Sequence, residues 1–100
     1  MKYNKLVRDK IPEYIKKKGG KPVVHIAGDS EYWEKLKEKL LEEAGEFNQA
    51  ENIEEMADIM EVVDAISAFK GFNINEIEKV KNKKAEEKGK LNDRIILDEA

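Results

Sequence analysis

Apolar residues recur every three to four positions along four stretches of the chain, and glycine or proline interrupts the pattern between them. This spacing is typical of amphipathic α-helices. The first stretch predicts a helix from Asp9, as the N-cap, to Lys18, and Gly19-Gly20 end it. Residues 22–26 begin with a proline and are mostly apolar, so we expect this short segment to be extended.

Three longer helices are predicted further along the chain. They cover residues 30–50, 53–70 and 76–88. Ser30, Asn52 and Asn75 are the predicted N-caps, because their side chains can accept a hydrogen bond from a free N–H of the first turn. Gly71 and Gly89 are expected to end the last two helices.

Short connections between successive helices favour antiparallel neighbours. The predicted fold is therefore all-α, an antiparallel bundle of about four helices with one short extended segment, in a single domain of residues 1–100. Residues 91–97 are too apolar for a free tail, so we expect them to dock on the bundle or on a second subunit. A domain of this size has a thin stability margin, which favours a homo-oligomer, a dimer or higher.

The amino-acid composition argues against several classes of function. The chain has no cysteine, 41% charged residues and a net charge of −3, so disulfides and thiolate zinc sites are excluded. Its 19 basic and 22 acidic residues are nearly balanced, which argues against a nucleic-acid partner. No stretch has the roughly 18 apolar residues of a membrane span. We expect a soluble, cytoplasmic protein with no membrane partner.

Acidic residues interrupt the apolar face of the second helix. At about 100° per residue, five apolar residues fall within an arc of roughly 80°. They are Trp33, Leu36, Leu40, Ala44 and Phe47. Glu43 lies inside this arc, about 20° from Leu36, and Glu46 lies on its flank, whereas Glu42 is about 120° away.

The third helix is apolar almost all round, which predicts that it is the most buried element. Its apolar residues are Ile53, Met56, Ile59, Met60, Val62, Val63, Ile66 and Phe69. Glu55 and Asp58 lie among them, while Glu61 and Asp64 point away. Acidic residues therefore interrupt the apolar surface of the third helix, as they do in the second helix.

Two pairs of acids, Glu43 with Glu46 and Glu55 with Asp58, have the spacing i, i+3. Each pair lies one turn apart on its helix, and the tight link between the helices folds the pairs toward each other. Four partly buried carboxylates need a counter-charge, because desolvation and mutual repulsion disfavour their ionised forms. A divalent cation supplies it, and ligation by oxygen alone favours Mg²⁺ or Mn²⁺.

The acidic motifs resemble those of a known family. Residues 42–46, EEAGE, followed by residues 54–58, EEMAD, resemble the EExxE…ExxD signature of the all-α nucleoside-triphosphate pyrophosphatases, the MazG-like and phosphoribosyl-ATP pyrophosphohydrolase-like proteins. Residues 3–12 resemble the start of a small subgroup, and residues 84–95 are similar to its basic C-terminal segment. The resemblance thus covers nearly the whole chain as one such domain.

The resemblance implies an oligomeric helical protein that uses Mg²⁺ to hydrolyse a nucleotide between its α and β phosphates. The products would be a monophosphate and pyrophosphate. The implied metal ligands are Glu43, Glu46, Glu55 and Asp58. The implied catalytic residues are Glu42, Glu43 and Glu46, with Glu42 orienting or deprotonating the attacking water. The implied contacts to the nucleotide phosphates are Lys5, Arg8, Lys10, Lys84, Lys88 and Arg94.

Several alternatives stay open. Eight residues separate Glu46 from Glu55, a shorter spacer than in most MazG-like proteins, and Glu61-x-x-Asp64 would restore a longer one. Helical angle argues against that pair as direct ligands, but Asp64 could act behind them. The substrate could be a noncanonical nucleoside triphosphate, in house-cleaning of the nucleotide pool, or phosphoribosyl-ATP of histidine biosynthesis. A helical dimer that binds metal or nucleotide without turnover is the non-enzymatic alternative.

Overall fold

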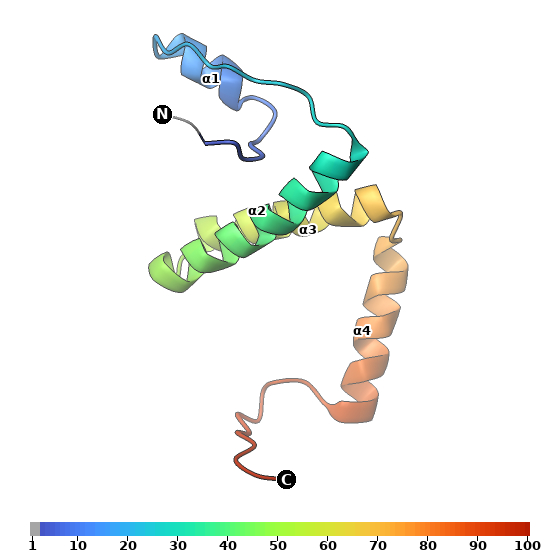
Figure 1. Cartoon of the computed structure of the whole chain (residues 1–100). Helices are drawn as coiled ribbons and strands as arrows, with labels where there is room; N and C mark the ends of the chain where they lie inside the picture. Colours follow the sequence, from blue (N-terminus) through green and yellow to red (C-terminus); the bar gives the residue numbers. More distant parts are fainter. Residues whose placement is uncertain (1–2) are drawn as a thin grey trace.

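A computed structural model describes residues 3–100 of the chain (Figure 1). These residues form four helices and no strand, which confirms the all-helical prediction. The helices are α1 (Ile11–Lys17), α2 (Asp29–Ala50), α3 (Ile53–Lys70) and α4 (Ile74–Lys88). Within the described part of the chain, none of them combines the length and the apolar character that crossing a membrane requires.

Helices α2 and α3 form an antiparallel hairpin, in which they lie side by side (Figure 1). Their link is two residues long. Glu51 adopts the left-handed conformation, with φ of 51°, and its N–H donates to the carbonyl of Phe47. The side chain of Asn52 accepts a hydrogen bond from the N–H of Glu55 at 3.0 Å, so this predicted cap is confirmed. Gly71 ends α3 in the left-handed conformation, as expected.

The other three predicted N-caps are wrong by one or two positions. The observed N-caps are Lys10, Gly28 and Asn73. Asp9 lies in the turn before α1, and Ser30 lies inside the first turn of α2. Asn73 takes the place of Asn75, since its backbone is extended and its side chain accepts hydrogen bonds from two N–H groups of the first turn. Side-chain preference selects a cap, but the backbone that enters the helix decides which residue can act as one.

One chain does not pack four helices into a bundle. Among residues 3–100, α2 and α3 are the helices with extensive mutual contact. Figure 1 shows α4 leaving the end of the hairpin and the C-terminal segment continuing away from it. Residues 91–97 are exposed, so the expected docking of this segment on its own bundle does not occur. The prediction that α3 is the most buried helix is not confirmed for one chain, because α3 has two buried residues, Val62 and Ser67, and α2 has as many.

Candidate metal and phosphate site

Glu43 lies on the inner face of the hairpin. It is 5% exposed, and Leu36 is the other buried residue of α2. The two are seven positions apart, which is close to two turns, so their side chains leave the helix on the same face. The predicted position of this glutamate within the apolar stripe is confirmed. A carboxylate in such a place is costly unless something compensates its charge.

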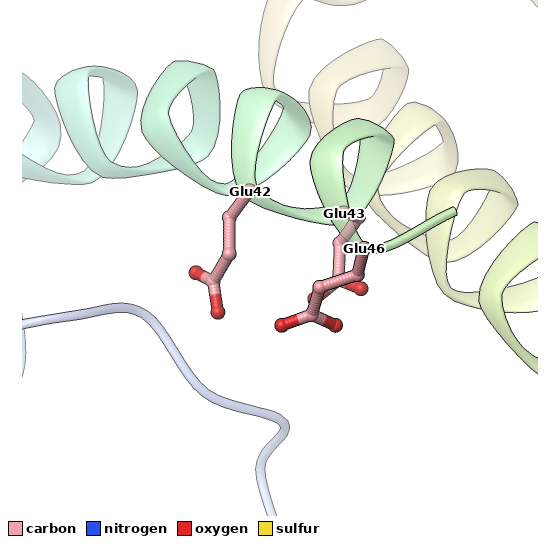
Figure 2. A group of neighbouring side chains, drawn as sticks. All are labelled: Glu42, Glu43 and Glu46. Carbon is pink, nitrogen blue, oxygen red and sulfur yellow. The ribbon is translucent and has the colours of Figure 1, made fainter. Parts of the chain in front are cut away.

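Two groups of carboxylates meet at Glu43. Ligand oxygens of Glu43, Glu55 and Asp58 lie within 4.8 Å of one another, and the same holds for Glu42, Glu43 and Glu46. Figure 2 shows the three side chains of the second group leaving the same side of α2. Glu55 and Asp58 are half-buried, whereas Glu46 is exposed. Three of the four predicted ligands thus come together from two helices, whereas the fourth, Glu46, groups with Glu42 and Glu43 on α2.

Two buried carboxylate oxygens in this cluster lack a hydrogen-bond partner among residues 3–100. They are Oε2 of Glu43 and Oε2 of Glu55, one from each helix of the hairpin. An unsatisfied buried acceptor costs about 1–3 kcal/mol, and more when it is charged. A cation between the two helices would satisfy both oxygens. The donor set, carboxylate oxygens with no sulfur or imidazole, fits a hard divalent ion such as Mg²⁺ or Mn²⁺.

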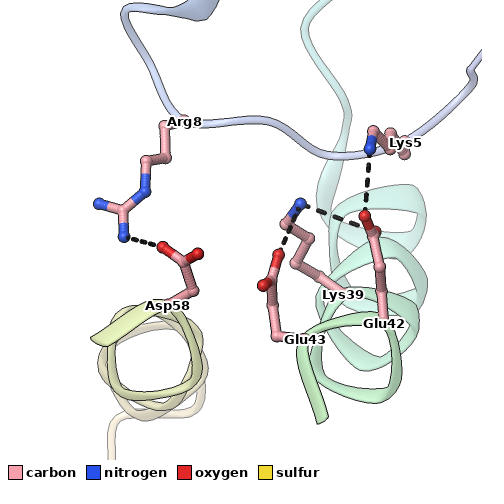
Figure 3. A network of polar contacts seen from close by, with 6 residues as sticks. All are labelled: Lys5, Arg8, Lys39, Glu42, Glu43 and Asp58. Carbon is pink, nitrogen blue, oxygen red and sulfur yellow. Dashed lines mark hydrogen bonds and ion pairs between the residues drawn. The ribbon is translucent and has the colours of Figure 1, made fainter. Parts of the chain in front are cut away.

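Lys39 partly neutralises the cluster from within α2. Its Nζ lies 3.1 Å from Oε1 of Glu43 and 3.6 Å from Oε2 of Glu42 (Figure 3). The lysine side chain is only 17% exposed. Lys39 was not among the predicted site residues, although its i, i+3 and i, i+4 spacing to the two glutamates is visible in the sequence. Lys39 occupies one oxygen of Glu43 and leaves the other free.

The segment before α1 brings two more cations to the acids (Figure 3). Nζ of Lys5 lies 3.1 Å from Oε1 of Glu42, and this hydrogen bond raises the pKa of the lysine. Nη2 of Arg8 lies 2.8 Å from Oδ1 of Asp58, and this hydrogen bond raises the pKa of the arginine. Both side chains are largely solvated, so each pair adds little stability. The two ion pairs instead fix the position of the N-terminal segment, which they hold across the carboxylates.

A cleft of about 870 Å³ lies between this N-terminal segment and the hairpin. Its charged lining consists of Lys5, Arg8, Asp9, Lys10, Lys39, Glu43, Asp58 and Glu61. Tyr3 and Tyr32 supply aromatic walls. The volume is within the range of small-molecule sites, about 300–1,000 Å³. Cations of the N-terminal segment that face acids of the hairpin (Figure 3) are an arrangement that suits a metal-bound phosphate compound.

The remaining predicted phosphate contacts lie elsewhere. Lys84 and Lys88 are on α4 and Arg94 follows it, in the part of the chain that Figure 1 shows leading away from the hairpin. Lys84 lines a separate, mainly apolar cavity of about 580 Å³ with Phe72 and Val80. A single chain therefore brings Lys5, Arg8 and Lys10 to the acids and carries the C-terminal cations away from them.

Glu61 and Asp64, which the sequence left open, take different positions. Glu61 lines the cleft and has a carboxylate oxygen 3.9 Å from Nη1 of Arg8. Asp64 is exposed and is not part of the cleft lining. Glu61 thus belongs to the rim of the site, next to the arginine rather than next to Glu43.

No family model matches the chain, and no solved structure matches it. An uncharacterised protein of Mycolicibacterium smegmatis is 48% identical over 46 residues, which are 46% of this chain and 47% of that protein. The match thus spans about half the length of that curated relative. It shows kinship over this stretch and assigns no activity.

Proposed function

We propose that the protein is a Mg²⁺-dependent nucleotide pyrophosphohydrolase of the all-α nucleoside-triphosphate pyrophosphatase type. It would convert a nucleoside triphosphate and water to the monophosphate and pyrophosphate. The observation that carries the proposal is the buried Glu43, which has an Oε2 without a partner among the described residues, groups with Glu55 and Asp58, and lines a cleft together with Lys5, Arg8 and Lys10.

The free-energy cost of burying these acids supports a functional role for them. A charge taken out of water costs several kcal/mol, and apolar side chains of similar size at positions 43 and 55 would pack the hairpin more stably. Part of the charge is compensated by Lys39, but two buried oxygens still lack partners among the described residues. A hairpin that needed only stability would not require this arrangement.

The roles of the residues follow from their positions. Glu43, Glu55 and Asp58 would hold the cation, with Glu46 at the exposed edge. Bound Mg²⁺ supplies positive charge for the phosphates and lowers the pKa of water. Glu42 is half-buried at the edge of the cluster, where its carboxylate can accept a proton from the attacking water. For this, its hydrogen bond to Lys5 has to be given up.

The cations of the rim would then serve the substrate. Lys5 and Arg8 contact acids in this structure, and Lys10 lines the same cleft. When a cation neutralises the acids, the ammonium and guanidinium groups become available to phosphate oxygens. Arg8 in particular can bind two oxygens at once through its planar group.

One observation favours a second candidate, a binding protein without turnover. Lys5, Arg8 and Lys39 already pair with three of the acids, as they would in a cluster that only fastens the N-terminal segment to the hairpin. Such a protein could bind a metal or a nucleotide, but it would not turn the nucleotide over. The two candidates therefore differ in what happens when Mg²⁺ and a nucleotide are added.

The test is pyrophosphate release from a panel of ordinary and noncanonical nucleoside triphosphates and phosphoribosyl-ATP, with Mg²⁺, Mn²⁺ or EDTA. We expect metal-dependent release from at least one compound, and the panel also identifies the substrate. Glu34→Gln is the control variant and should keep the wild-type activity, because Glu34 is an acid of α2 that pairs with Lys37 outside the cleft. If the folded wild-type protein releases no pyrophosphate from any compound of the panel, the enzymatic proposal is refuted and the binding protein is favoured.

A further inference from the structure

The two groups of carboxylates that meet at Glu43 differ in how their charge is compensated. The inter-helix group, Glu43, Glu55 and Asp58, contains both buried oxygens that lack a hydrogen-bond partner among the described residues. The α2 group is Glu42, Glu43 and Glu46. In this second group Glu46 is exposed to water, and the other two carboxylates are paired with lysines. The need for a further positive charge is therefore concentrated in the inter-helix group.

Lys39 compensates the α2 group from the same helix. Its Nζ lies 3.1 Å from Oε1 of Glu43 and 3.6 Å from Oε2 of Glu42, so that one ammonium group bridges two carboxylates (Figure 3). The lysine lies one turn before both glutamates, which brings the three side chains to one face of α2. Glu43 thus has a cation at one oxygen, and its other oxygen is buried without a partner.

This arrangement resembles one half of a two-metal site. In enzymes that use two metal ions, the ions lie about 3.5–4 Å apart and share the charge of the reacting phosphate. A carboxylate with one oxygen on each ion is compatible with that separation. Glu43 occupies such a bridging place here, with the ammonium of Lys39 at the position that a second metal ion would take.

Lys39 also differs from the two cations of the N-terminal segment. Its side chain is 17% exposed, whereas those of Lys5 and Arg8 are 42% and 54% exposed. Water therefore screens its attraction to the acids less than it screens theirs. Lys39 also stays beside its partners when the N-terminal segment moves, because all three residues belong to α2. Lys5 and Arg8 can exchange their acids for phosphate oxygens while Lys39 remains in place.

The formal charges of the two groups match a single divalent cation. The groups contain five carboxylates, and three cations pair with them: Lys5, Arg8 and Lys39. Five negative and three positive charges leave two negative charges, which one Mg²⁺ or Mn²⁺ neutralises. A second divalent ion would make the two groups positive before any phosphate is bound. It would also have to displace an ammonium group that two carboxylates hold.

We propose that Lys39 takes the place of a second metal ion, so that each chain binds one divalent cation, at Glu43, Glu55 and Asp58. Lys39 is then a positioning residue. It holds Oε1 of Glu43, which leaves Oε2 for the metal, and it keeps the carboxylate of Glu42 beside the cluster. The inference rests on the metal site of the proposed function, but it concerns the number of cations, which can be measured without a substrate.

The first test counts the Mn²⁺ ions that the full-length wild-type chain binds in the absence of nucleotide, by calorimetry and by electron paramagnetic resonance. We expect one ion per chain, with the spectrum of an isolated Mn²⁺. Two ions per chain with the spectrum of a spin-coupled pair would overturn this proposal and leave the enzymatic proposal intact. If the folded protein binds no Mn²⁺, the metal site of the proposed function fails, and this inference fails with it.

The second test removes the ammonium group. Lys39→Gln should bind two Mn²⁺ ions per chain as a spin-coupled pair, because the α2 group loses the charge that excludes the second ion. Lys39→Arg keeps the positive charge and should bind one ion. Lys37→Gln is the matched control and should also bind one, since Lys37 is a lysine of α2 that pairs with Glu34 outside the cleft.

Circular dichroism verifies the fold of each variant. A folded Lys39→Gln protein that still binds a single Mn²⁺ would show that the lysine does not exclude a second ion, and would overturn the proposal. A second ion bound by Lys39→Arg would overturn it as well, because a positive charge at position 39 would then be compatible with a metal pair. The count in the wild-type chain decides the proposal even if Lys39→Gln does not fold.

Discussion

The two basic segments of the chain behave differently. The segment before α1 and residues 84–95 both carry lysine and arginine side chains, but the first lies across the acids and the second leads away from them (Figures 1 and 3). Leu6 and Val7 are partly buried beside the charges of the first segment, whereas Leu91 and Ile95 of the second are exposed. Charge alone therefore does not place a segment. Apolar anchors next to the charges do, and within one chain the C-terminal segment has nothing to anchor on.

The largest expected effect tests the acids that the N-terminal segment covers. Glu43→Gln combined with Glu55→Gln should lower metal-dependent pyrophosphate release by about 100-fold or more, because the two buried ligands lose their charge. Without metal, the Tm of this variant should be at least as high as that of the wild type, since two buried charges have been removed. Circular dichroism verifies the fold. Activity that survives in the folded variant would refute the ligand assignment.

The contrast between the two segments is tested by Arg8→Ala and Arg94→Ala. We expect a loss of about 10-fold in kcat/KM for the first, because Arg8 is the planar cation nearest Asp58. For the second we expect a loss of about 3-fold at most, as for an exposed charge remote from the cleft. Kinetics with the best substrate of the panel gives both values. Equal losses would break the contrast and would show that Arg94 matters for activity as much as Arg8 does.

A smaller effect is expected from Lys39→Gln. Lys39 occupies Oε1 of Glu43, so its ammonium competes with a divalent cation for the same carboxylate. Its removal should tighten Mn²⁺ binding about 3- to 10-fold in calorimetry, a readout that needs no substrate. Lys37→Gln is the control, since Lys37 pairs with Glu34 on α2 away from the cleft. Unchanged or weaker Mn²⁺ binding would contradict a metal site at Glu43.

The smallest effect concerns the attachment of the N-terminal segment. The pKa of Lys5 is raised above its ordinary value of 10.5, so the stabilisation from this lysine is complete below that pH and is lost as the pH rises through the raised pKa. The stabilisation is below about 1 kcal/mol because the side chain is solvated. The difference in Tm between the wild type and Lys5→Met should therefore be small at pH 9 and vanish at higher pH. A difference that grows with pH would contradict the ion pair.

The sequence predicted the inner face of the hairpin well. Helical angle placed Glu43 next to Leu36, and the spacing of Glu55 and Asp58 brought both to the same region, because these positions depend on local geometry alone. The cap at Asn52 and the end at Gly71 are local too. They were confirmed for the same reason.

The failures share a different cause. Predicting that α3 would be the most buried helix, or whether residues 91–97 dock on the bundle of their own chain, requires knowledge of what packs against them, which no local pattern contains. Lys39 was missed because lysines of a chain with 41% charged residues are ordinarily solvated. Its burial follows from the position of Glu43 and becomes visible only when the two helices are in place.

The two-residue link between α2 and α3 also limits the insertions that the chain can accept between its two acidic motifs. An extra residue at the start of α3 would turn Glu55 and Asp58 by about 100° and shift them along the axis by about 1.5 Å. The acids would then no longer meet Glu43. A longer spacer can preserve the cluster only if whole turns are added to both helices together, so that tolerated insertions here come in steps of about seven residues. The number of residues between the two acidic motifs can therefore change only in steps set by the helical repeat.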